Sequence, residues 1–315
     1  MAVEISVDAL TDRDVPALIE LCRAALDLPE DAAEAAEIVT GLAARRAATH
    51  PAVGLVARAR DEVRGVAIGS LADRMPGHGH VDLVAVHPAV RREGAGRALL
   101  ASLETALARR GATEVLLAGN PPHYAWPGVD VRYTPAICLA EALGYRHDRT
   151  AWNMTVDLTD PDAPGLRDPG SAERRLADQG ITVRAAGPAD VPALVALARE
   201  FGGEWAGELT GSVGSPGAGC HLAVRGDGEL LGFAAYGSGR PSWFGPTGTA
   251  PAARGLGIGA VLLRRCLRDQ RAAGVRRAQI SWVGPVPFYA RVADARIERV
   301  FFLFRKQLAG TGAIS

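Results

Sequence analysis

Charge of either sign is in balance in this chain, and lysine is almost missing. The 35 basic residues match the 35 acidic ones, so the formal net charge at pH 7 is +0, and Lys306 is the only lysine. A chain without a basic excess has no general electrostatic attraction for nucleic acid or for an anionic membrane. We therefore expect neither among its partners.

Cysteine is also scarce, and its spacing indicates no metal or redox motif. None of the four cysteines forms a CxxC pair, and most lie in apolar contexts, which favours buried free thiols in a reducing compartment. His78-x-His80 is the only metal-like spacing, but no cysteine or carboxylate accompanies it, so no metal is expected. A secretory signal pattern and a membrane-length apolar run are both missing, so we expect a soluble, cytoplasmic protein.

Three nucleotide-binding and hydrolase motifs are missing or incomplete. Gly255-x-Gly257-x-x-Ala260 satisfies the loose dinucleotide fingerprint, but the region about 20 residues further on reads Gln279-Ile280-Ser281, without the required acidic residue. The Gly-Lys-(Ser/Thr) of a P-loop and the Gly-x-Ser-x-Gly elbow of an α/β-hydrolase do not occur. Nucleotide binding and serine hydrolysis are therefore not favoured.

The sequence does contain one glycine-rich turn, and it occurs twice. The first copy is Val86-His87-Pro88-Ala89-Val90-Arg91-Arg92-Glu93-Gly94-Ala95-Gly96-Arg97, and the second is Thr249-Ala250-Pro251-Ala252-Ala253-Arg254-Gly255-Leu256-Gly257-Ile258-Gly259-Ala260. Each runs into an amphipathic helix, and each residue of the second copy lies 163 positions after its counterpart. Glycines let backbone N–H groups approach an anion, and the helix dipole adds partial positive charge, so each turn predicts a cradle for a diphosphate.

Both copies resemble the acyl-CoA-binding signature of the GNAT N-acetyltransferase superfamily, Val-x-Pro-x-x-(Arg/Gln)-x-x-Gly-x-(Gly/Ala). The first copy fits at every position, and the second departs once, with Thr249 in place of valine. The resemblance extends over nearly the whole chain and implies a tandem GNAT protein that uses acetyl-CoA as cosubstrate. The cofactor-binding residues it implies are Val86, Arg91, Arg92, Gly94, Ala95, Gly96, Arg97, Thr249, Arg254, Gly255, Gly257, Ile258, Gly259 and Ala260.

Length and repeat together predict two domains. Asp14-Val15-Pro16-Ala17-Leu18 recurs as Asp190-Val191-Pro192-Ala193-Leu194, and strand and helix patterns follow in the same order in both halves. We expect an α/β protein of two GNAT-like domains, each a mixed, mainly antiparallel sheet with a splayed centre, flanked by helices. The expected domains are 1–157 and 181–315, and residues 158–180, rich in Pro, Asp and Gly, are expected as a linker.

The resemblance also implies a direct attack of an amine on the thioester, which needs a base, an oxyanion-binding N–H and an acid, commonly tyrosine. Tyr289, in Phe288-Tyr289-Ala290, matches the family's acid, and Ala140 takes that position in the first half. Asp82 lies four residues before Val86, where some members place a carboxylate base, and the second half has Gly245 there. Each residue could instead be an ordinary structural one, a core aromatic or an outward strand carboxylate.

Neither half carries both groups, which leaves three explanations open. The second half is catalytic and the first binds CoA or is structural; the first half is active with Tyr124, Tyr133 or Tyr145 as acid; or one site is shared between the halves. We favour the first explanation, because the acid tyrosine is the more characteristic feature.

Two stretches are candidates for binding the acceptor. The first half carries an insertion, Pro121 to Arg132, whose Tyr124, Trp126 and Asp130 could line a pocket or merely cover the end of the sheet. In the second half Glu200, Glu204 and Glu208 would face together on a helix and could attract a cationic amine, although three nearby glycines weaken that helix.

The sequence thus predicts an N-acetyltransferase that transfers an acetyl group from acetyl-CoA to a primary amine of a small molecule. The alternatives are a non-catalytic acyl-CoA-binding or -sensing protein, which the separation of Asp82 from Tyr289 keeps open, and a protein N-acetyltransferase. Among partners we expect the amine substrate and leave room for a homodimer.

Overall fold

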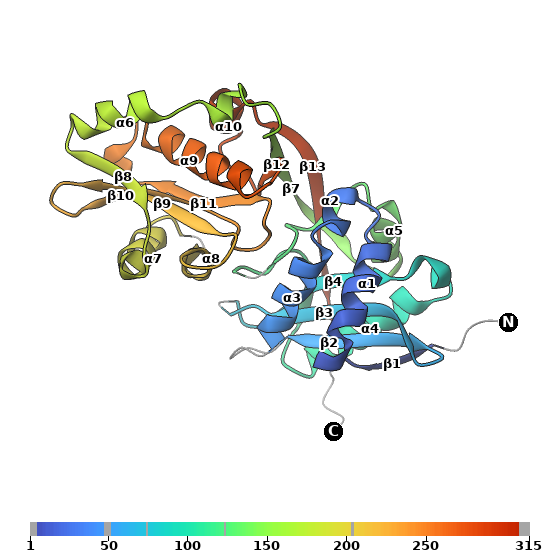
Figure 1. Ribbon diagram of the computed structural model, residues 1–315. Helices are drawn as coiled ribbons and strands as arrows, with labels where there is room; N and C mark the ends of the chain where they lie inside the picture. Colours follow the sequence, from blue (N-terminus) through green and yellow to red (C-terminus); the bar gives the residue numbers. More distant parts are fainter. Residues whose placement is uncertain (1–4, 47–51, 74, 123, 203–204, 309–315) are drawn as a thin grey trace. The chain divides into compact units, whose positions relative to one another are not determined.

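The computed structural model describes residues 5–46, 52–73, 75–122, 124–202 and 205–308. The chain forms two compact units (Figure 1). The N-unit comprises Met1–Ala151 with Val300–Ser315, and the C-unit comprises Trp152–Arg299. Each unit is a mixed, mainly antiparallel sheet flanked by helices, which confirms the predicted fold class.

The N-unit is built on the strand order β1-β2-β3-β4-β5. These strands are β1 (Ser6–Ala9), β2 (Val53–Ala59), β3 (Glu62–Leu71), β4 (His78–Val86) and β5 (Glu114–Leu117). Neighbours are antiparallel except β4 and β5, which are parallel. That parallel pair requires a crossover connection, and the glycine turn and α4 (Ala95–Ala108) supply it.

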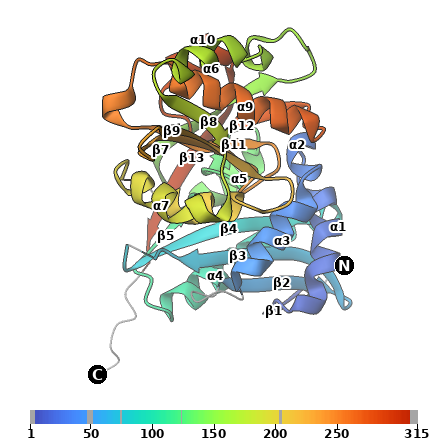
Figure 2. The same cartoon turned by 60° about the vertical axis from the view of Figure 1, so that its left-hand side comes forward.

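Side chains that alternate along β2 and β3 divide the N-unit core into two layers. Val56 and Val66 pack beneath α1 (Val15–Ala25) and α3 (Ala35–Arg46), whereas Ala57 and Ala67 pack beneath α4. Figure 2 shows α1 and α3 side by side over β2, β3 and β4. The period of two in the sequence thus places one helical layer on each face. The other helices of this unit are α2 (Pro29–Ala32), α5 (Thr134–Ala142) and the 3-10 turns η1 (Asp12–Asp14) and η2 (Pro88–Val90).

The C-unit repeats this plan in the order β8-β9-β10-β11-β12. Its strands are β8 (Ile181–Ala185), β9 (Gly219–Arg225), β10 (Leu230–Tyr236), β11 (Trp243–Thr249) and β12 (Arg277–Ile280), of which only β11 and β12 are parallel neighbours. α9 (Ile258–Ala272) lies on one face, and α7 (Val191–Arg199) and α8 (Trp205–Ser212) lie on the other (Figure 1). The remaining helices are α6 (Gly170–Ala177), α10 (Val286–Ala293) and the 3-10 turns η3 (Pro164–Leu166), η4 (Pro188–Asp190) and η5 (Pro251–Ala253).

Two long strands are exchanged between the units. β7 (Arg146–Asp157) begins in the N-unit, but its residues Met154 to Asp157 pair with β12 of the C-unit. β13 (Arg296–Gln307) begins in the C-unit, but its residues Phe304 to Gln307 pair with β5 of the N-unit. Each sheet is therefore continued by a strand from the other half, and the boundaries differ from the expected domains 1–157 and 181–315.

The expected linker, residues 158–180, is instead a packed part of the C-unit. It contains η3 and α6, and its apolar residues Leu158, Leu166 and Leu176 are all less than 5% exposed. Glu173 of α6 pairs with Arg265 of α9 at 2.7 Å. The composition is that of a linker, but the burial of these three leucines in the C-unit core outweighs the Pro and Gly content.

Candidate functional site

The two glycine turns have the same backbone conformation. Gly94 and Gly257 cap α4 and α9 in the left-handed region, with φ of 92° and 88°. Two residues earlier the chain is left-handed again, at Arg92 (φ 69°) and Gly255 (φ 85°). A left-handed residue with a Cβ costs about 1–2 kcal/mol, so the arginine carries strain that the second copy avoids. The repeat in the sequence is therefore a repeat in conformation.

Each turn presents backbone N–H groups to open space. The first amides of α4 and α9 have no carbonyl one turn earlier to bond, as at any helix start. A Cβ added to Gly94 or Gly257 would meet no atom of the described residues within 4 Å, so the space next to each cap glycine is open there. Free amides, a helix dipole and room together fit a diphosphate group.

The last glycine of each turn has a different role. A Cβ on Gly96 would lie 3.1 Å from Leu139 Cδ2 of α5, and a Cβ on Gly259 would lie 3.4 Å from Phe288 Cζ of α10. These glycines allow two helices to pack closely. The space beside Gly96 is tight and that beside Gly259 allows an ordinary contact, and the cofactor-binding role of both glycines stays a prediction.

The arginines of the two turns are used differently. The Arg91 guanidinium donates to Val86 O (3.2 Å) and Ala25 O (2.8 Å) and pairs with Asp27 at 3.1 Å, so it ties the turn to the end of α1. Arg91 is therefore an anchor in this structure, whereas its counterpart Arg254 is exposed.

Further cations lie only on the first turn. Arg92 and Arg97 are exposed beside the cap of α4, where the second turn has Gly255 and Ala260. The two cradles therefore share a backbone and differ in charge.

Beside each turn the two central parallel strands diverge. In the described chain β4 pairs with β5 only over His78 to His80, and β11 pairs with β12 only over Trp243 and Phe244. Among the described residues, the β4–β5 pairing does not continue beyond His80, and the β11–β12 pairing does not continue beyond Phe244. The result in each unit is the splayed centre that the GNAT resemblance implies, located beside the glycine turn.

A β-bulge marks the start of each splay. The β3–β4 register shifts between Ile68 and Gly69, which leaves Asp82 as the extra residue. The β10–β11 register shifts between Ala234 and Tyr236, opposite Gly245 and Pro246. Bulges re-aim backbone groups and side chains, and they are common beside active sites. Asp82, which is 7% exposed, and Gly245 thus occupy matching places in the two units.

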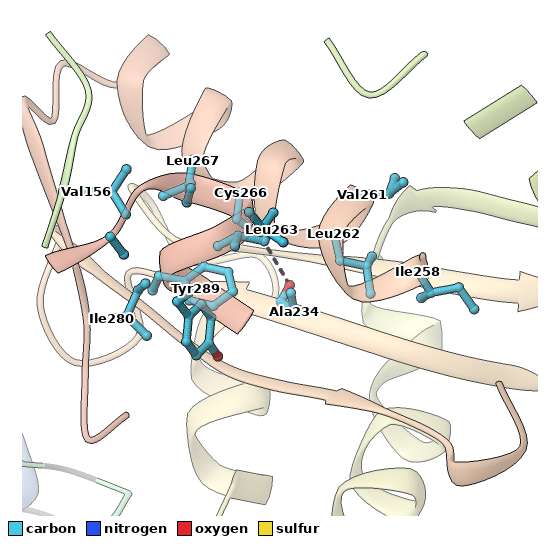
Figure 3. Close-up of a cluster of buried hydrophobic side chains, with 14 of the residues drawn as sticks. Val156, Ala234, Ile258, Val261, Leu262, Leu263, Cys266, Leu267, Ile280 and Tyr289 are labelled. Carbon is cyan, nitrogen blue, oxygen red and sulfur yellow. Dashed lines mark hydrogen bonds between the residues drawn. The ribbon is translucent and has the colours of Figure 1, made fainter. Parts of the chain in front are cut away.

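Tyr289 stands at the splay of the C-unit. It lies in the first half of α10 and is 4% exposed, and its ring centroid lies 6.0 Å from that of Phe244, the last residue of β11 that pairs with β12. Its hydroxyl points away from Leu263 and Cys266 of α9 (Figure 3). Burial raises the pKa of Tyr289, so the phenol stays protonated at neutral pH. The residue has the position and the protonation state of a general acid, and the acid role itself stays a prediction.

The N-unit has no tyrosine at the matching place in the part that the structure describes. Ala140, 1% exposed, lies there in α5. Tyr133 donates its hydroxyl to Asp31 at 3.0 Å, Tyr145 is buried among core residues, and the ring of Tyr124 packs on Gly119. Each of the three alternative acid tyrosines thus makes contacts that stabilise the N-unit. Asp82 and Tyr289 belong to different units.

The insertion braces the N-unit. Asp130 is 1% exposed and is held by Arg132, which also pairs with Glu30 at 2.7 Å. Its short strand β6 (Val129–Asp130) pairs with β13, and Trp126 packs against the core below α1 and α3. These contacts match the structural reading of the insertion. A substrate role for Tyr124, Trp126 and Asp130 stays a prediction.

The described residues hold no group of three or more metal-ligating side chains. His80 Nδ1 lies 2.9 Å from Ala118 O, and His78 pairs with Glu114 at 3.1 Å. Among the helices that the structure describes, none has the length and apolar character that a membrane span requires.

A cavity of about 220 Å³ lies in the C-unit, lined among others by Ser212, His221, Tyr236 and Asp269. It is at the end of β10 remote from the glycine turn, because Tyr236 ends β10 whereas Gly232 pairs with Thr249. A 2.6 Å contact between His221 Nε2 and Asp269 links β9 to α9 there. No sequence pattern indicates this pair, because its members are 48 residues apart.

Comparison with known proteins defines the class. A family model described as the acetyltransferase (GNAT) family matches residues 18–126 and 194–291, one stretch in each half. The two stretches cover well over half of the sequence, and each contains one glycine turn. The chain belongs to the GNAT acetyltransferase family, in tandem arrangement. No curated protein sequence matches it.

Solved structures share the fold over nearly the whole chain. A tandem GNAT protein from the clavulanic acid biosynthesis pathway has a TM-score of 0.67 at 20% identity, with 96% of this chain and 98% of that chain covered. A GCN5-related N-acetyltransferase from Sphaerobacter thermophilus has a TM-score of 0.65 at 23% identity, covering 96% and 95%. The GCN5-related glucosamine N-acetyltransferase region of a fungal multi-domain β-N-acetylglucosaminidase has a TM-score of 0.72 at 18% identity; it covers 97% of this chain, which spans only 38% of that protein.

Proposed function

We propose that this protein transfers an acetyl group from acetyl-CoA to a primary amine of a small molecule, and that the C-unit performs the reaction. The observation that carries the proposal is the position of Tyr289 at the splay, in contact with Phe244 and next to an open anion cradle. The N-unit has the cradle and the splay, but Ala140 replaces the tyrosine. We infer that it binds acyl-CoA without turning it over.

The residues of the C-unit divide the work as follows. The amides that follow Gly257 hold the diphosphate, and the gap between β11 and β12 receives the pantetheine arm. Acetyl-CoA supplies an acyl group activated as a thioester. Tyr289 donates its phenolic proton to the sulfur that leaves, which a phenol with a pKa raised by burial can do because it is still protonated when the C–S bond breaks.

A second candidate function is acyl-CoA binding without chemistry. It is favoured by one observation: the carboxylate at the bulge and the tyrosine at the splay lie in different units, as Asp82 and Tyr289. In that case both cradles bind and no amine is acetylated. Turnover of acetyl-CoA against a panel of small primary amines separates the two functions.

The test is calorimetric titration of acetyl-CoA into the wild type and into Gly94→Trp and Gly257→Trp, with turnover measured in parallel. A tryptophan at either cap fills the cradle and occupies a left-handed position, so it removes binding to that unit. We expect Gly257→Trp to lose turnover and Gly94→Trp to keep it. Thermal unfolding of each variant controls for folding. Loss of turnover only in Gly94→Trp would assign the reaction to the N-unit instead.

A further inference from the structure

The cavity at the far end of β10 has three hydrogen-bonded side chains in its lining. His221 comes from β9, Tyr236 ends β10, and Asp269 lies near the end of α9, which covers both strands (Figure 1). His221 pairs with Ala234 across the two strands, and Ala234 lies two residues before Tyr236, so both rings are on the face of the sheet that α9 covers. The fold therefore brings a histidine, a tyrosine and an aspartate to one place.

Asp269 holds the other two side chains in place. His221 Nε2 donates to Asp269 Oδ2 at 2.6 Å, and the Tyr236 hydroxyl donates to the same oxygen at 3.3 Å. The Tyr236 hydroxyl lies over Gly219, where an added Cβ would stand 2.6 Å from the hydroxyl oxygen. Burial raises the pKa of Asp269, but the hydrogen bonds from His221 and Tyr236 outweigh it and hold the pKa below its usual value. Asp269 is therefore a carboxylate at neutral pH.

Each of these three side chains keeps an acceptor for a further hydrogen bond. Neither contact uses Asp269 Oδ1, and a tyrosine hydroxyl that donates still accepts through its oxygen. The contact of His221 Nε2 with a carboxylate places a hydrogen on that nitrogen, so Nδ1 is the acceptor of the neutral imidazole. His221 is 7% exposed, and no described residue donates to its buried Nδ1. A buried acceptor without a donor is unfavourable, so a donor that reaches it is favoured.

The size and charge of the cavity limit what it can hold. A volume of about 220 Å³ corresponds to about seven water molecules at roughly 30 Å³ each, which is too little for acetyl-CoA. The described residues that line it include one carboxylate and no lysine or arginine. Arg265, one turn earlier on α9, is paired with Glu173 at 2.7 Å. The cavity therefore suits a compact cation that carries several hydrogen-bond donors.

The cavity is separate from the place where acetyl transfer is proposed. Asp269 lies about 18 Å along α9 from Gly257, at about 1.5 Å of helix rise per residue. Tyr236 is likewise at the opposite end of β10 from Gly232, which pairs with Thr249 of the glycine turn. A ligand small enough for the cavity cannot span this distance, so it takes no part in the transfer itself.

We propose that this cavity is a second ligand site of the protein and that it binds a small primary ammonium ion. An ammonium group has three N–H donors, and the site offers three acceptors, on Asp269, His221 and Tyr236. Its positive charge matches the carboxylate, and a short carbon chain fits against Ala186 and Val213 in the lining. The inference does not depend on the proposed function, because acetyl-CoA has no role in it.

The experiment titrates the intact chain with n-propylammonium at constant pH and follows the NMR signal of the His221 imidazole, assigned with His221→Asn. We expect a saturable shift with a Kd in the millimolar range, because so small a ligand makes few contacts. n-Propanol has the same size without the charge and should bind at least about 10-fold more weakly, as should n-propylammonium to Asp269→Asn. Tyr236→Phe should weaken binding by about two- to five-fold. Asp178→Asn, which changes an exposed aspartate after α6, is the matched control and should bind as the wild type does.

Gly257→Trp separates this site from the site of acetyl transfer. It fills the C-unit cradle and should leave the shift of the His221 signal unchanged, whereas loss of the shift would move the ammonium to the transfer site and overturn the inference. Equal binding of n-propanol, an unaffected Asp269→Asn or the lack of any saturable shift would overturn it as well. Preferential binding of propionate would make the cavity an anion site, which also contradicts the inference. Thermal unfolding of each variant controls for folding.

Discussion

The two units keep the same backbone at the glycine turn and differ in the side chains around it. Both units have a cap glycine, a left-handed residue two positions before it, a splay and a bulge, at the same spacing. The side chains of Asp82, Arg92 and Arg97 have no equivalent at the matching positions of the C-unit, and Tyr289 has none in the N-unit. The cradle is made by main-chain amides, which tolerate any side chain that does not fill the space. A proton donor is one atom of one side chain, so a single replacement removes it.

The largest expected effect comes from separating the two units. We expect residues 1–157 alone not to fold, because the fragment lacks the β13 segment that pairs with β5 and contributes Phe304, which is 1% exposed. Removing one such buried phenylalanine typically costs about 3–5 kcal/mol, comparable to much of the stability of a domain. Circular dichroism would show a disordered fragment, and co-expression with residues 158–315 should restore a folded complex. A cooperatively unfolding 1–157 would show that the exchanged strand is dispensable.

The next largest expected effect is on the turnover rate, from removal of the Tyr289 hydroxyl. We expect Tyr289→Phe to lower kcat by about 10²- to 10⁴-fold, because the ring still fills its place beside Phe244 while the donor is gone. Tyr133→Phe, which removes a hydroxyl bound to Asp31, is the control and should leave kcat within a few-fold. Steady-state rates with unchanged acetyl-CoA affinity would support the assignment. An unaffected Tyr289→Phe would place the proton donor elsewhere.

The smallest effect concerns charge at the cradles. Arg97→Ala should weaken acetyl-CoA binding to the N-unit by about two- to five-fold, since an exposed ion pair is worth roughly 0.2–1 kcal/mol. The loss should shrink as salt is raised, because exposed charges are screened. The reciprocal Ala260→Arg should tighten binding to the C-unit by a similar factor. Calorimetry at two ionic strengths checks both, and salt-independent changes would mean that the arginine acts through packing.

Local features of this site could be predicted from the sequence. The glycine pattern around Gly94 and Gly257 located both turns, and the offset of 163 residues between them aligned Asp82 with Gly245 at the two bulges. Helix caps and strand ends depend on neighbouring residues, so a repeat in the sequence is enough to locate them. Tyr289 was found for the same reason, from its place early in a helix.

Contacts between distant residues could not be predicted in this way. The alternation of apolar and polar residues along β13 does not indicate which strand it pairs with, because the pairing depends on the rest of the sheet as well as on the strand. The Arg91–Asp27 pair joins residues 64 positions apart and turns a motif arginine into an anchor. The stretch 158–180 has a loop-like composition, and its leucines are buried because they pack against α9, which lies about 100 residues further along the chain.

The exchange of β13 also has a consequence for synthesis. In β13, Gln307 pairs with Glu114 of β5, which lies 193 positions earlier in the chain. Domains usually fold in turn as they leave the ribosome, the first while the second is still being made. Here the sheet of the N-unit stays one strand short until the whole C-unit has been made, so the two units cannot complete their folding one after the other.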